Sequence, residues 1–167
     1  EEAFRAGVRL AALRERDLTA RDLLDMAERA ARLAETHGAR LLVNDRVDVA
    51  VLARAAGVHL RATSVPAAAA RSLLEPGSLV GVSVHTAAEA RAASGADFVV
   101  FGPVFATPAK ARYCPPQGIE NLRAAVRASR VPVFAIGGVT PGRARECLAA
   151  GAHGVATIGG ILAAPSI

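Results

Sequence analysis

Short apolar runs alternate with longer amphipathic stretches along the whole chain, and this alternation predicts the fold. Seven runs of four to six residues are aliphatic or β-branched with little polar alternation, a pattern typical of strands buried on both faces of a parallel sheet. Strand and helix repeated in alternation predict an α/β fold. The expected strands are residues 8–13, 40–44, 57–60, 79–83, 98–101, 132–136 and 154–158, and the expected helices are 20–36, 47–55, 67–74, 87–94, 119–128 and 141–150.

The two ends of the chain indicate which α/β fold this is. Residues 1–6 are typical of the end of a helix, which implies a further strand before them, and residues 163–167 follow the seventh strand without a closing helix. We therefore expect one TIM (β/α)8-barrel domain over residues 1–167, without its first strand and last helix. Further residues or a partner must then cover the two exposed strand edges. An open doubly wound sheet is the alternative, but no GxGxxG or Walker loop follows any expected strand.

Composition narrows the class of protein. Hydrophobic residues make up 52% and charged residues 21% of the chain, which excludes a disordered chain. No apolar run reaches the ~18–20 residues that would span a bilayer. The net charge is +5, but the arginines are scattered and Tyr113 is the only Tyr or Trp residue, so we expect no nucleic-acid partner. Cys114 and Cys147 lie far apart and form no disulfide framework, which predicts a reduced, cytoplasmic protein.

In a barrel, the polar residues that follow the strands line the functional face. Glycine pairs follow the last two expected strands, at Gly137–Gly138 and Gly159–Gly160. Glycine lets backbone N–H groups approach an anion closely, so these pairs predict a phosphate site, with plain turn chemistry as the alternative. The other polar positions at strand ends are residues 14–16, 44–46, Ser64, Ser83, His85 and the loop 102–118.

Four positions at strand ends carry residue types with chemistry of their own. Lys110 is the only lysine in the chain and lies in the long loop, so it is either an active-site ammonium or a solvated charge. Asp45 could bind Mg²⁺ together with substrate oxygens, or it could cap the helix expected from residue 47. Arg14 is a candidate anion ligand. His85 is a candidate acid or base at neutral pH, with a structural histidine as the alternative.

Several longer motifs resemble the thiamine-phosphate synthase/TenI superfamily of barrels, nearly from end to end. They are LRERDL at residues 13–18, VNDRVDVA at 43–50, GVHL at 57–60, GVSVHT at 81–86, FGPVFATPAK at 101–110, PVFAIGG at 132–138 and GVA at 154–156. The resemblance implies one of two activities. The synthase branch joins a pyrimidine methyl diphosphate to a thiazole phosphate and releases diphosphate. The TenI branch includes thiazole tautomerases, which aromatise a thiazole carboxylate phosphate by a proton shift without Mg²⁺.

The resemblance also implies roles for individual residues. In the synthase branch, three groups of positions carry the function: the diphosphate and Mg²⁺ site, the substrate pocket and the cradle of the thiazole phosphate. They match, in that order, Arg14, Asn44, Asp45 and Lys110; Ser83 and Thr107; and Gly137, Gly138, Ile158 and Gly159. The implied partners are a thiazole phosphate and, in the synthase branch, a pyrimidine diphosphate, with no membrane partner and with a homodimer left open.

Departures from the synthase pattern bear on the choice of branch. Ala12 replaces a glutamine, Arg16 replaces a lysine, and Ser64 falls where a His-Leu-Gly-x-x-Asp pattern has the second metal carboxylate. Ser64 and Arg16 look more like the TenI branch, and the loss of one of two carboxylates weakens a Mg²⁺ site. The acid/base histidine of some tautomerases falls at Pro103, for which His85 is the only nearby substitute.

We therefore expect a TenI-like, thiazole tautomerase-type enzyme that binds a thiazole phosphate, uses His85, Lys110 and Arg14 in catalysis, and needs no cofactor. One alternative is a thiamine-phosphate synthase with Mg²⁺ on Asp45. The other is a non-catalytic barrel that binds a phosphate ligand. Diphosphate release separates the first alternative from the other two.

Overall fold

Helices and strands alternate through the computed structural model, which describes residues 1–107 and 115–162. The seven strands follow one another in chain order from β1 to β7, and neighbouring strands are parallel wherever their register is defined. This order confirms the expected parallel α/β fold. The chain divides into two compact units, Glu1–Val80 and a second unit that begins at Gly81.

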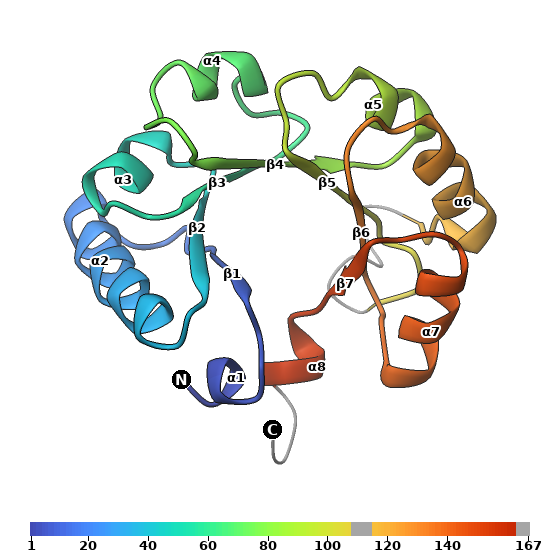
Figure 1. The fold of residues 1–167 in the computed structure, drawn as a ribbon, viewed down its shortest axis with the longest axis horizontal. Coiled ribbons are helices and arrows are strands. Elements are labelled where there is room, and N and C mark those ends of the chain that lie inside the picture. The colour runs from blue at the N-terminus through green and yellow to red at the C-terminus, as the bar shows by residue number, and fades with distance from the viewer. Residues whose placement is uncertain (108–114, 163–167) are drawn as a thin grey trace. The chain divides into compact units, whose positions relative to one another are not determined.

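The first unit presents three strand ends at one edge of its sheet. Figure 1 shows α2 and α3 on the same side of these strands, and both helices contact β2. The register pairs Leu13 with Val43 and Asn44 with His59, so the residues that follow the three strands are neighbours. The strands are β1 (Leu10–Leu13), β2 (Arg40–Asn44) and β3 (Gly57–Leu60), and the helices are α1 (Glu2–Arg5), α2 (Ala20–Thr36), α3 (Val47–Leu52) and α4 (Ala67–Arg71).

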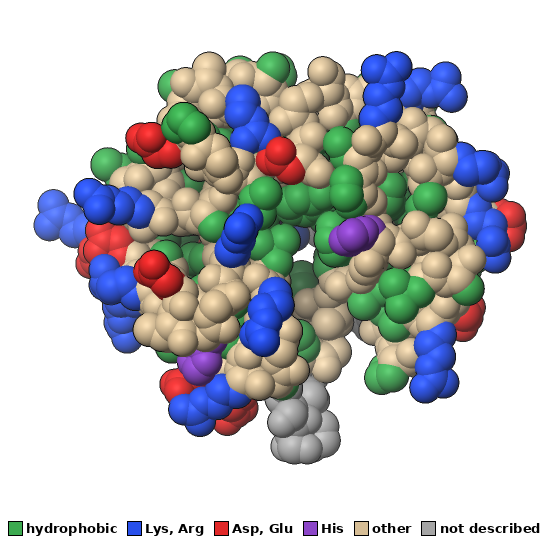
Figure 2. Space-filling model, viewed as in Figure 1, with side chains coloured by type: hydrophobic (Ala, Val, Ile, Leu, Met, Phe, Trp, Pro, Cys, Tyr) green, Lys and Arg blue, Asp and Glu red, His purple; other side chains and the backbone are tan. Residues whose placement is uncertain are grey.

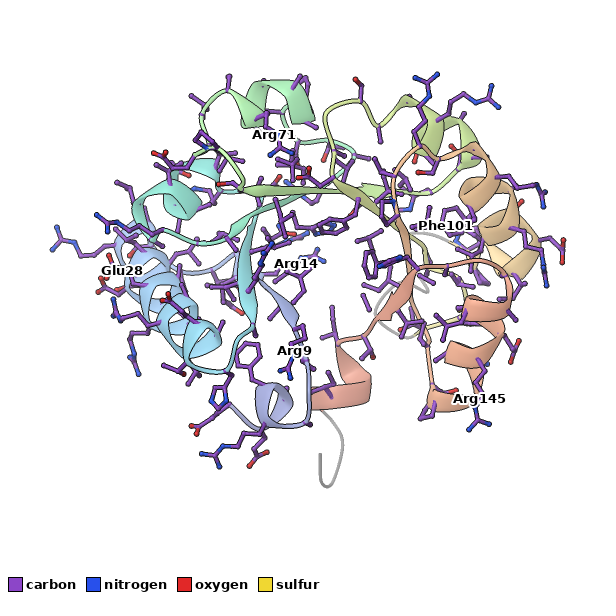
Figure 3. All side chains as sticks on the ribbon, in the orientation of Figure 1. Arg9, Arg14, Glu28, Arg71, Phe101 and Arg145 are labelled. Atoms are coloured by element: carbon purple, nitrogen blue, oxygen red, sulfur yellow. The ribbon has the colours of Figure 1, made fainter. Side chains whose placement is uncertain are left out.

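The second unit has its own hydrophobic core. Phe101, Leu122 and Cys147 are fully buried in it, and Figure 3 shows Phe101 in the region between β5 and α6. β4 (Leu79–Val84) begins in the first unit and continues into the second. The other strands are β5 (Phe98–Phe101), β6 (Val133–Ile136) and β7 (Gly154–Ala156), and the helices are α5 (Ala87–Ala92), α6 (Gly118–Ala128), α7 (Pro141–Ala149) and α8 (Gly159–Leu162).

Two phenylalanine rings cover glycines on neighbouring strands of the second unit. The register pairs Gly81 with Phe98 and Gly154 with Phe134. A Cβ atom at Gly81 would lie 2.3 Å from the Phe98 ring, and one at Gly154 would lie 2.8 Å from the Phe134 ring. The two rings meet edge to face with 5.5 Å between centroids, and His153 continues the row at 5.3 Å from Phe134. The glycines thus leave the space that the rings fill.

One glycine allows a close backbone approach in the first unit. Gly57 begins β3 with a φ of +147°, and a Cβ atom there would lie 1.9 Å from the Leu79 carbonyl oxygen and 2.6 Å from the Leu79 nitrogen. The Leu79 N–H donates a hydrogen bond to the Ala56 carbonyl at 2.8 Å. Because the nearest atoms belong to the backbone of a paired strand, they cannot rotate away from a side chain.

Threonine side chains cap two helices of the second unit. Thr86 Oγ1 accepts a hydrogen bond from the Glu89 N–H at 3.1 Å, and Thr140 Oγ1 accepts one from the Arg143 N–H at 3.4 Å. The Glu89 carboxylate reaches back and accepts a hydrogen bond from the His85 N–H at 2.6 Å. This carboxylate therefore fixes the turn that joins the end of β4 to α5.

The last described element is a single helical turn. Gly159–Leu162 forms α8, and the Gly160 N–H donates to Thr157 Oγ1 at 3.2 Å. Residues 163–167, which are expected to end the chain without a closing helix, lie outside the described residues. A helix of four residues is too short to show helical periodicity in the sequence. Within residues 1–107 and 115–162, no helix is both long and apolar enough to cross a membrane.

Charged side chains are dispersed over the surface. In the view of Figure 2, Lys and Arg side chains occur at many places around the edge of the molecule, and several of them lie beside Asp or Glu side chains. Some of the ion pairs join neighbouring turns of one helix, such as Arg32 with Glu28 at 3.6 Å and Arg123 with Glu120 at 3.5 Å. Pairs of this kind belong to solvated helix faces, as the scattering of arginines in the sequence predicts.

Candidate functional site

The strands of the first unit end in a group of charged and polar side chains, the Asp45 cluster. It consists of Arg14 and Arg16 after β1, Asp45 after β2, and Arg61 and Ser64 after β3. Arg61 Nε donates a hydrogen bond to Asp45 Oδ2 at 2.5 Å, and Arg61 Nη2 forms an ion pair with the same oxygen. Ser64 Oγ donates a hydrogen bond to Asp45 Oδ1. Both oxygens of this carboxylate therefore have partners within the chain.

The backbone at Asp45 has an uncommon conformation. Its φ is +68°, and the Arg46 N–H donates to the Asn44 carbonyl at 2.8 Å, which closes a tight turn around Asp45. The Asp45 N–H donates to the His59 carbonyl at 3.0 Å. Aspartate tolerates this region better than most residues, but a non-glycine residue held there costs about 1–3 kcal/mol. The surrounding hydrogen bonds offset that cost and fix the position of the carboxylate.

The structure rejects the alternative that Asp45 caps the following helix. The N-cap of α3 is Arg46, and no side chain caps that helix. Arg46 pairs instead with Asp48, through Nε to Oδ1 at 2.8 Å and Nη2 to Oδ2 at 2.6 Å. The Asp45 carboxylate is therefore left for the interactions of the Asp45 cluster.

Ser64 holds the turn that carries Arg61. Ser64 Oγ accepts a hydrogen bond from the Arg61 N–H at 2.8 Å, and the Ser64 N–H donates to the Arg61 carbonyl at 3.0 Å. The Ser64 hydroxyl has a single O–H group, and this group donates its hydrogen bond to Asp45. Ser64 thus positions Arg61 and Asp45 relative to one another through one oxygen atom.

Positive charge exceeds negative charge in the Asp45 cluster. Burial alone would raise the pKa of Asp45, but hydrogen bonds from Ser64 and Arg61, and the charges of Arg61 and Arg16, lower it below its ordinary value. Burial lowers the pKa of Arg14, as do the charges of Arg16 and Arg61, while Asp45 acts in the opposite direction. An arginine in water-accessible surroundings keeps its proton even so. Three guanidinium groups near one carboxylate attract anions.

The Asp45 cluster does not fit Mg²⁺. This ion prefers near-octahedral oxygen ligands at about 2.0–2.1 Å and takes them from carboxylates, waters and substrate. The cluster has one carboxylate, and both of its oxygens accept hydrogen bonds from Arg61 and Ser64. In the described part of the chain, no three His, Cys, Asp or Glu side chains gather closely enough to hold a metal ion. A divalent cation at Asp45 would have to displace the Arg61 guanidinium group, and it would be repelled by the positive charges of Arg14 and Arg16.

His59, in β3, contributes a pH dependence to the first unit. Its side chain is half-buried, and burial lowers its pKa below the ordinary value of 6.5. The positive charge of Arg14 acts in the same direction, and Asp45 acts in the opposite one. The unfolded chain therefore binds a proton at a higher pH than the folded chain does. This contribution to stability is present above pH 6.5 and is lost progressively as the pH falls from there through the folded pKa.

We expect the His59→Gln variant to lose less stability in mild acid than the wild type does. Its side chain binds no proton, so the linkage described for His59 is absent. Thermal unfolding followed by circular dichroism between about pH 8 and about pH 5 measures the effect as the fall in Tm. At the upper pH, His59 is neutral in both the folded and the unfolded chain, so the difference in Tm between the two proteins there reports only the change in packing. An equal fall in Tm for both proteins would contradict the expectation.

In the second unit, the turn after β6 is built on the two glycines that sequence analysis singled out. Gly137 has a φ of +97° and Gly138 a φ of +63°, and a Cβ atom at either would lie 2.5 Å from Pro103 or Ala106. The Phe105 N–H donates to the Gly137 carbonyl at 3.0 Å. This backbone-to-backbone packing requires glycine whether or not a phosphate binds. The phosphate cradle at Gly137 and Gly138 stays a prediction.

Arg143 adds a positive charge to this turn. Its Nη1 donates to the Gly138 carbonyl at 2.9 Å, and its guanidinium carbon lies 4.7 Å from the centroid of the Phe105 ring. These contacts hold the charge near the N-terminus of α7, a helix of nine residues whose dipole also favours anions. Sequence analysis missed Arg143, and the available signal was its place three residues after the N-cap Thr140.

His85 follows β4 and contacts the loop after β5. Its Nδ1 lies 2.5 Å from the Gly102 carbonyl oxygen, and because a carbonyl only accepts hydrogen bonds, Nδ1 carries the proton. In the neutral ring, Nε2 is then the acceptor. Pro103, joined to Gly102 by a cis peptide bond, has no group that transfers a proton. The catalytic role of His85 stays a prediction.

The other expected site residues of the second half are Ser83, Thr107, Ile158, Gly159 and Lys110. Ser83 and Thr107 are half-buried, and Ile158 is 57% exposed. A Cβ atom at Gly159 would meet nothing within 4 Å, so packing does not require glycine there. The roles of these four residues stay predictions, and Lys110 lies outside the described residues.

Arg14 and Asp45 follow neighbouring strands, since the register pairs Leu13 of β1 with Val43 of β2. Figure 3 shows Arg14 on the side of β1 and β2 away from α2. The role of the two residues in a diphosphate site stays a prediction. Asn44, the third expected residue in this unit, is half-buried and precedes Asp45 at the end of β2. Sequence analysis missed Arg61, whose only signal was its place three residues before Ser64.

Comparisons with known proteins agree with this architecture. A family model described as thiamine monophosphate synthase matches residues 1–161. The chain is 52% identical over 167 residues to a Geobacter sulfurreducens protein named "Putative thiamine-phosphate synthase", across 99% of this chain and 78% of that protein. It is 44% identical over 164 residues to the thiamine-phosphate synthase of Albidiferax ferrireducens, across 97% of this chain and 75% of that protein.

A solved structure is similar in fold. The thiamine phosphate pyrophosphorylase from Pyrococcus furiosus superimposes with a TM-score of 0.89 at 33% identity, across 99% of this chain and 80% of that chain. This match confirms the expected class of fold. The names of these relatives favour the synthase alternative over the tautomerase-type activity that Ser64 and Arg16 suggested. By the match over residues 1–161, the chain belongs to the thiamine monophosphate synthase family.

Proposed function

We propose that this chain is a thiamine-phosphate synthase. The enzyme would join the methylene carbon of a hydroxymethylpyrimidine diphosphate to the ring nitrogen of a thiazole phosphate. The bond between that carbon and the diphosphate oxygen breaks, and its electron pair leaves with the diphosphate. The thiazole nitrogen donates its lone pair to form the new bond and becomes positively charged. Family membership and the names of the relatives support this reaction.

The observation that carries the proposal is the excess of positive charge in the Asp45 cluster. Negative charge develops on the diphosphate as it leaves, so groups that stabilise this charge lower the barrier most. Arg14, Arg16 and Arg61 are donors at the strand ends of the first unit, where Arg46 is already paired with Asp48. Since the cluster does not fit Mg²⁺, no step of this mechanism depends on a metal ion.

The turn after β6 supports binding of the second substrate. A phosphate at the N-terminus of α7 would find backbone N–H groups, the helix dipole and the Arg143 guanidinium. Gly137 and Gly138 let the backbone of this turn pack closely against Pro103 and Ala106. We therefore assign the thiazole phosphate to this turn.

Ser64 no longer favours a tautomerase. Its replacement of a carboxylate comes together with an arginine at position 61, and the two side chains hold Asp45 jointly. Ser64 removes a negative charge and Arg61 adds a positive one, so both changes make the site more positive, as a bound cation would. Such a site remains suited to a diphosphate, although the cation differs.

The experiment that tests the function supplies both substrates to the purified protein. We expect thiamine phosphate and diphosphate to appear in equal amounts, measured by chromatography and by a coupled diphosphate assay. The Asp45→Ala variant should be at least about tenfold slower, because it removes a charged partner of Arg61. Asp48→Ala is the matched control, since Asp48 pairs with Arg46 in the neighbouring turn.

Three outcomes of this experiment would overturn the proposal in whole or in part. One is the absence of thiamine phosphate when both substrates are saturating, with or without Mg²⁺. Another, which overturns only the assignment of the diphosphate to the Asp45 cluster, is an equal loss of rate in the Asp45→Ala and Asp48→Ala variants. The third is isomerisation of a thiazole carboxylate phosphate that depends on His85, without any release of diphosphate.

A further inference from the structure

The Asp45 carboxylate is oriented toward an arginine rather than toward open solvent. Arg61 contacts Asp45 Oδ2 through two nitrogens, and Ser64 contacts Oδ1. The Asp45 side chain is only 21% exposed, whereas the Arg61 side chain is 44% exposed. The carboxylate is therefore largely covered by its partners, while the guanidinium group remains accessible to a ligand.

The remaining donors of Arg61 suit an anion. A guanidinium group has five N–H donors in one plane, and the contacts with Asp45 use two of its three nitrogens. The planar fork matches phosphate oxygens geometrically, and such charge-assisted hydrogen bonds are among the strong ones. Arg14 and Arg16 follow β1 and Arg61 follows β3, strands whose ends flank that of β2 in the register, so the strand ends around Asp45 offer more than one guanidinium group to an anion.

Asp45 and Ser64 act as positioning residues for this arginine. The tight turn at Asp45, the hydrogen bond from its N–H to His59 and the two hydrogen bonds between Ser64 and Arg61 fix both ends of the pair. A side chain held in this way loses less conformational freedom when it binds a ligand. A fixed guanidinium group thus supplies the positive charge that a divalent cation would otherwise bring.

We propose that Arg61, held by Asp45 and Ser64, replaces a divalent cation in this chain, so that the Asp45 cluster binds the diphosphate group directly. The ligand class is an inorganic or organic diphosphate. That the diphosphate is the leaving group of a synthase rests on the proposed function, whereas metal-free binding of diphosphate does not.

The first test measures binding of inorganic diphosphate by isothermal titration calorimetry in excess EDTA. We expect the wild type to bind, and Mg²⁺ added in place of EDTA not to tighten binding. The Arg61→Gly variant should bind about tenfold to a hundredfold more weakly, the usual range for a lost hydrogen bond to a charged group. Arg46→Gly is the matched control, because Arg46 also pairs with an aspartate in this unit.

The second test converts the site. The double variant Arg61→Gly with Ser64→Asp carries two carboxylates and no arginine on Asp45, so we expect it to bind Mn²⁺ and to need a divalent cation for diphosphate binding. Electron paramagnetic resonance of free Mn²⁺ reports the metal directly, and the wild type should bind none at millimolar Mn²⁺. Circular dichroism melting checks that each variant is folded. If the double variant does not fold, the wild-type measurements alone decide.

The outcomes separate this inference from the proposed function. Wild-type binding of Mn²⁺, or diphosphate binding that requires Mg²⁺, would overturn the inference and leave the synthase proposal standing. Diphosphate binding in EDTA without formation of thiamine phosphate would uphold the inference and overturn the function. If Arg61→Gly and Arg46→Gly weaken the affinity for diphosphate equally, the inference is also overturned, because binding would then depend on the net positive charge of the protein and not on Arg61.

Discussion

The Gly57→Ala variant is expected to lose about 4 kcal/mol or more of unfolding free energy, which is a large part of the stability of an ordinary domain. The added methyl group would lie 1.9 Å from the Leu79 carbonyl oxygen, so the backbones of β3 and β4 would have to separate. The positive φ of Gly57 adds strain to this clash. Urea unfolding followed by circular dichroism measures the loss.

Gly77→Ala is the control for this prediction. Gly77 also has a positive φ, +86°, but a Cβ atom there would meet nothing within 4 Å. Its replacement should therefore cost only the backbone strain, about 1–2 kcal/mol. Equal losses in the two variants would show that the close approach of Leu79 does not matter. If Gly57→Ala accumulates only as insoluble protein while Gly77→Ala is soluble, the expectation is met in its extreme form.

The Arg14→Ala variant is expected to lower kcat/KM for thiamine phosphate formation by about 10²–10³, the usual cost of removing a donor aimed at developing negative charge. Arg14 follows β1, and its charge acts together with those of Arg16 and Arg61. Arg14→Lys should recover part of the rate, because it keeps the charge but loses the planar fork. Steady-state kinetics with both substrates measures the effect.

Arg9→Ala is the matched control for Arg14. Arg9 precedes β1, and its Nη1 lies 3.4 Å from the His37 carbonyl. Figure 3 labels both arginines. Removing an exposed charge outside the Asp45 cluster should change kcat/KM by less than a factor of about three, since long-range surface charges are screened by salt. A similar loss in both variants would mean that Arg14 acts only through net charge.

Much of the fold could be predicted from the sequence because two signals coincide. Apolar runs such as residues 98–101 are buried on both faces, and the caps at Thr86 and Thr140 mark helix starts independently of hydrophobicity. The helix at Gly159–Leu162 is one turn long and carries no hydrophobic periodicity, although Thr157 Oγ1 accepts a hydrogen bond from the Gly160 N–H at its start. Hydrophobic periodicity therefore locates the long elements and misses this single turn.

The candidate site was predictable only in part, because its key contact is non-local. Asp45 is visible in the sequence as a polar residue at a strand end, and so is Ser64. The contact of Asp45 with Arg61 depends on the register that pairs Asn44 with His59, and register is not set by spacing along the chain. The same dependence explains why Asp45 could be taken for a metal ligand or a helix cap until its partners were known.

The glycine–phenylalanine pairs of β4 to β7 have a consequence for how this sequence can change. Gly81 and Phe98 share one volume, as do Gly154 and Phe134. A larger residue at either glycine is tolerated only if the paired phenylalanine has first been replaced by a smaller residue, and that replacement alone leaves a cavity. Each single substitution is therefore expected to give a less stable protein than either the original pair or the fully exchanged pair. The sheet face of the second unit should for this reason evolve in pairs of positions across neighbouring strands, and not one position at a time.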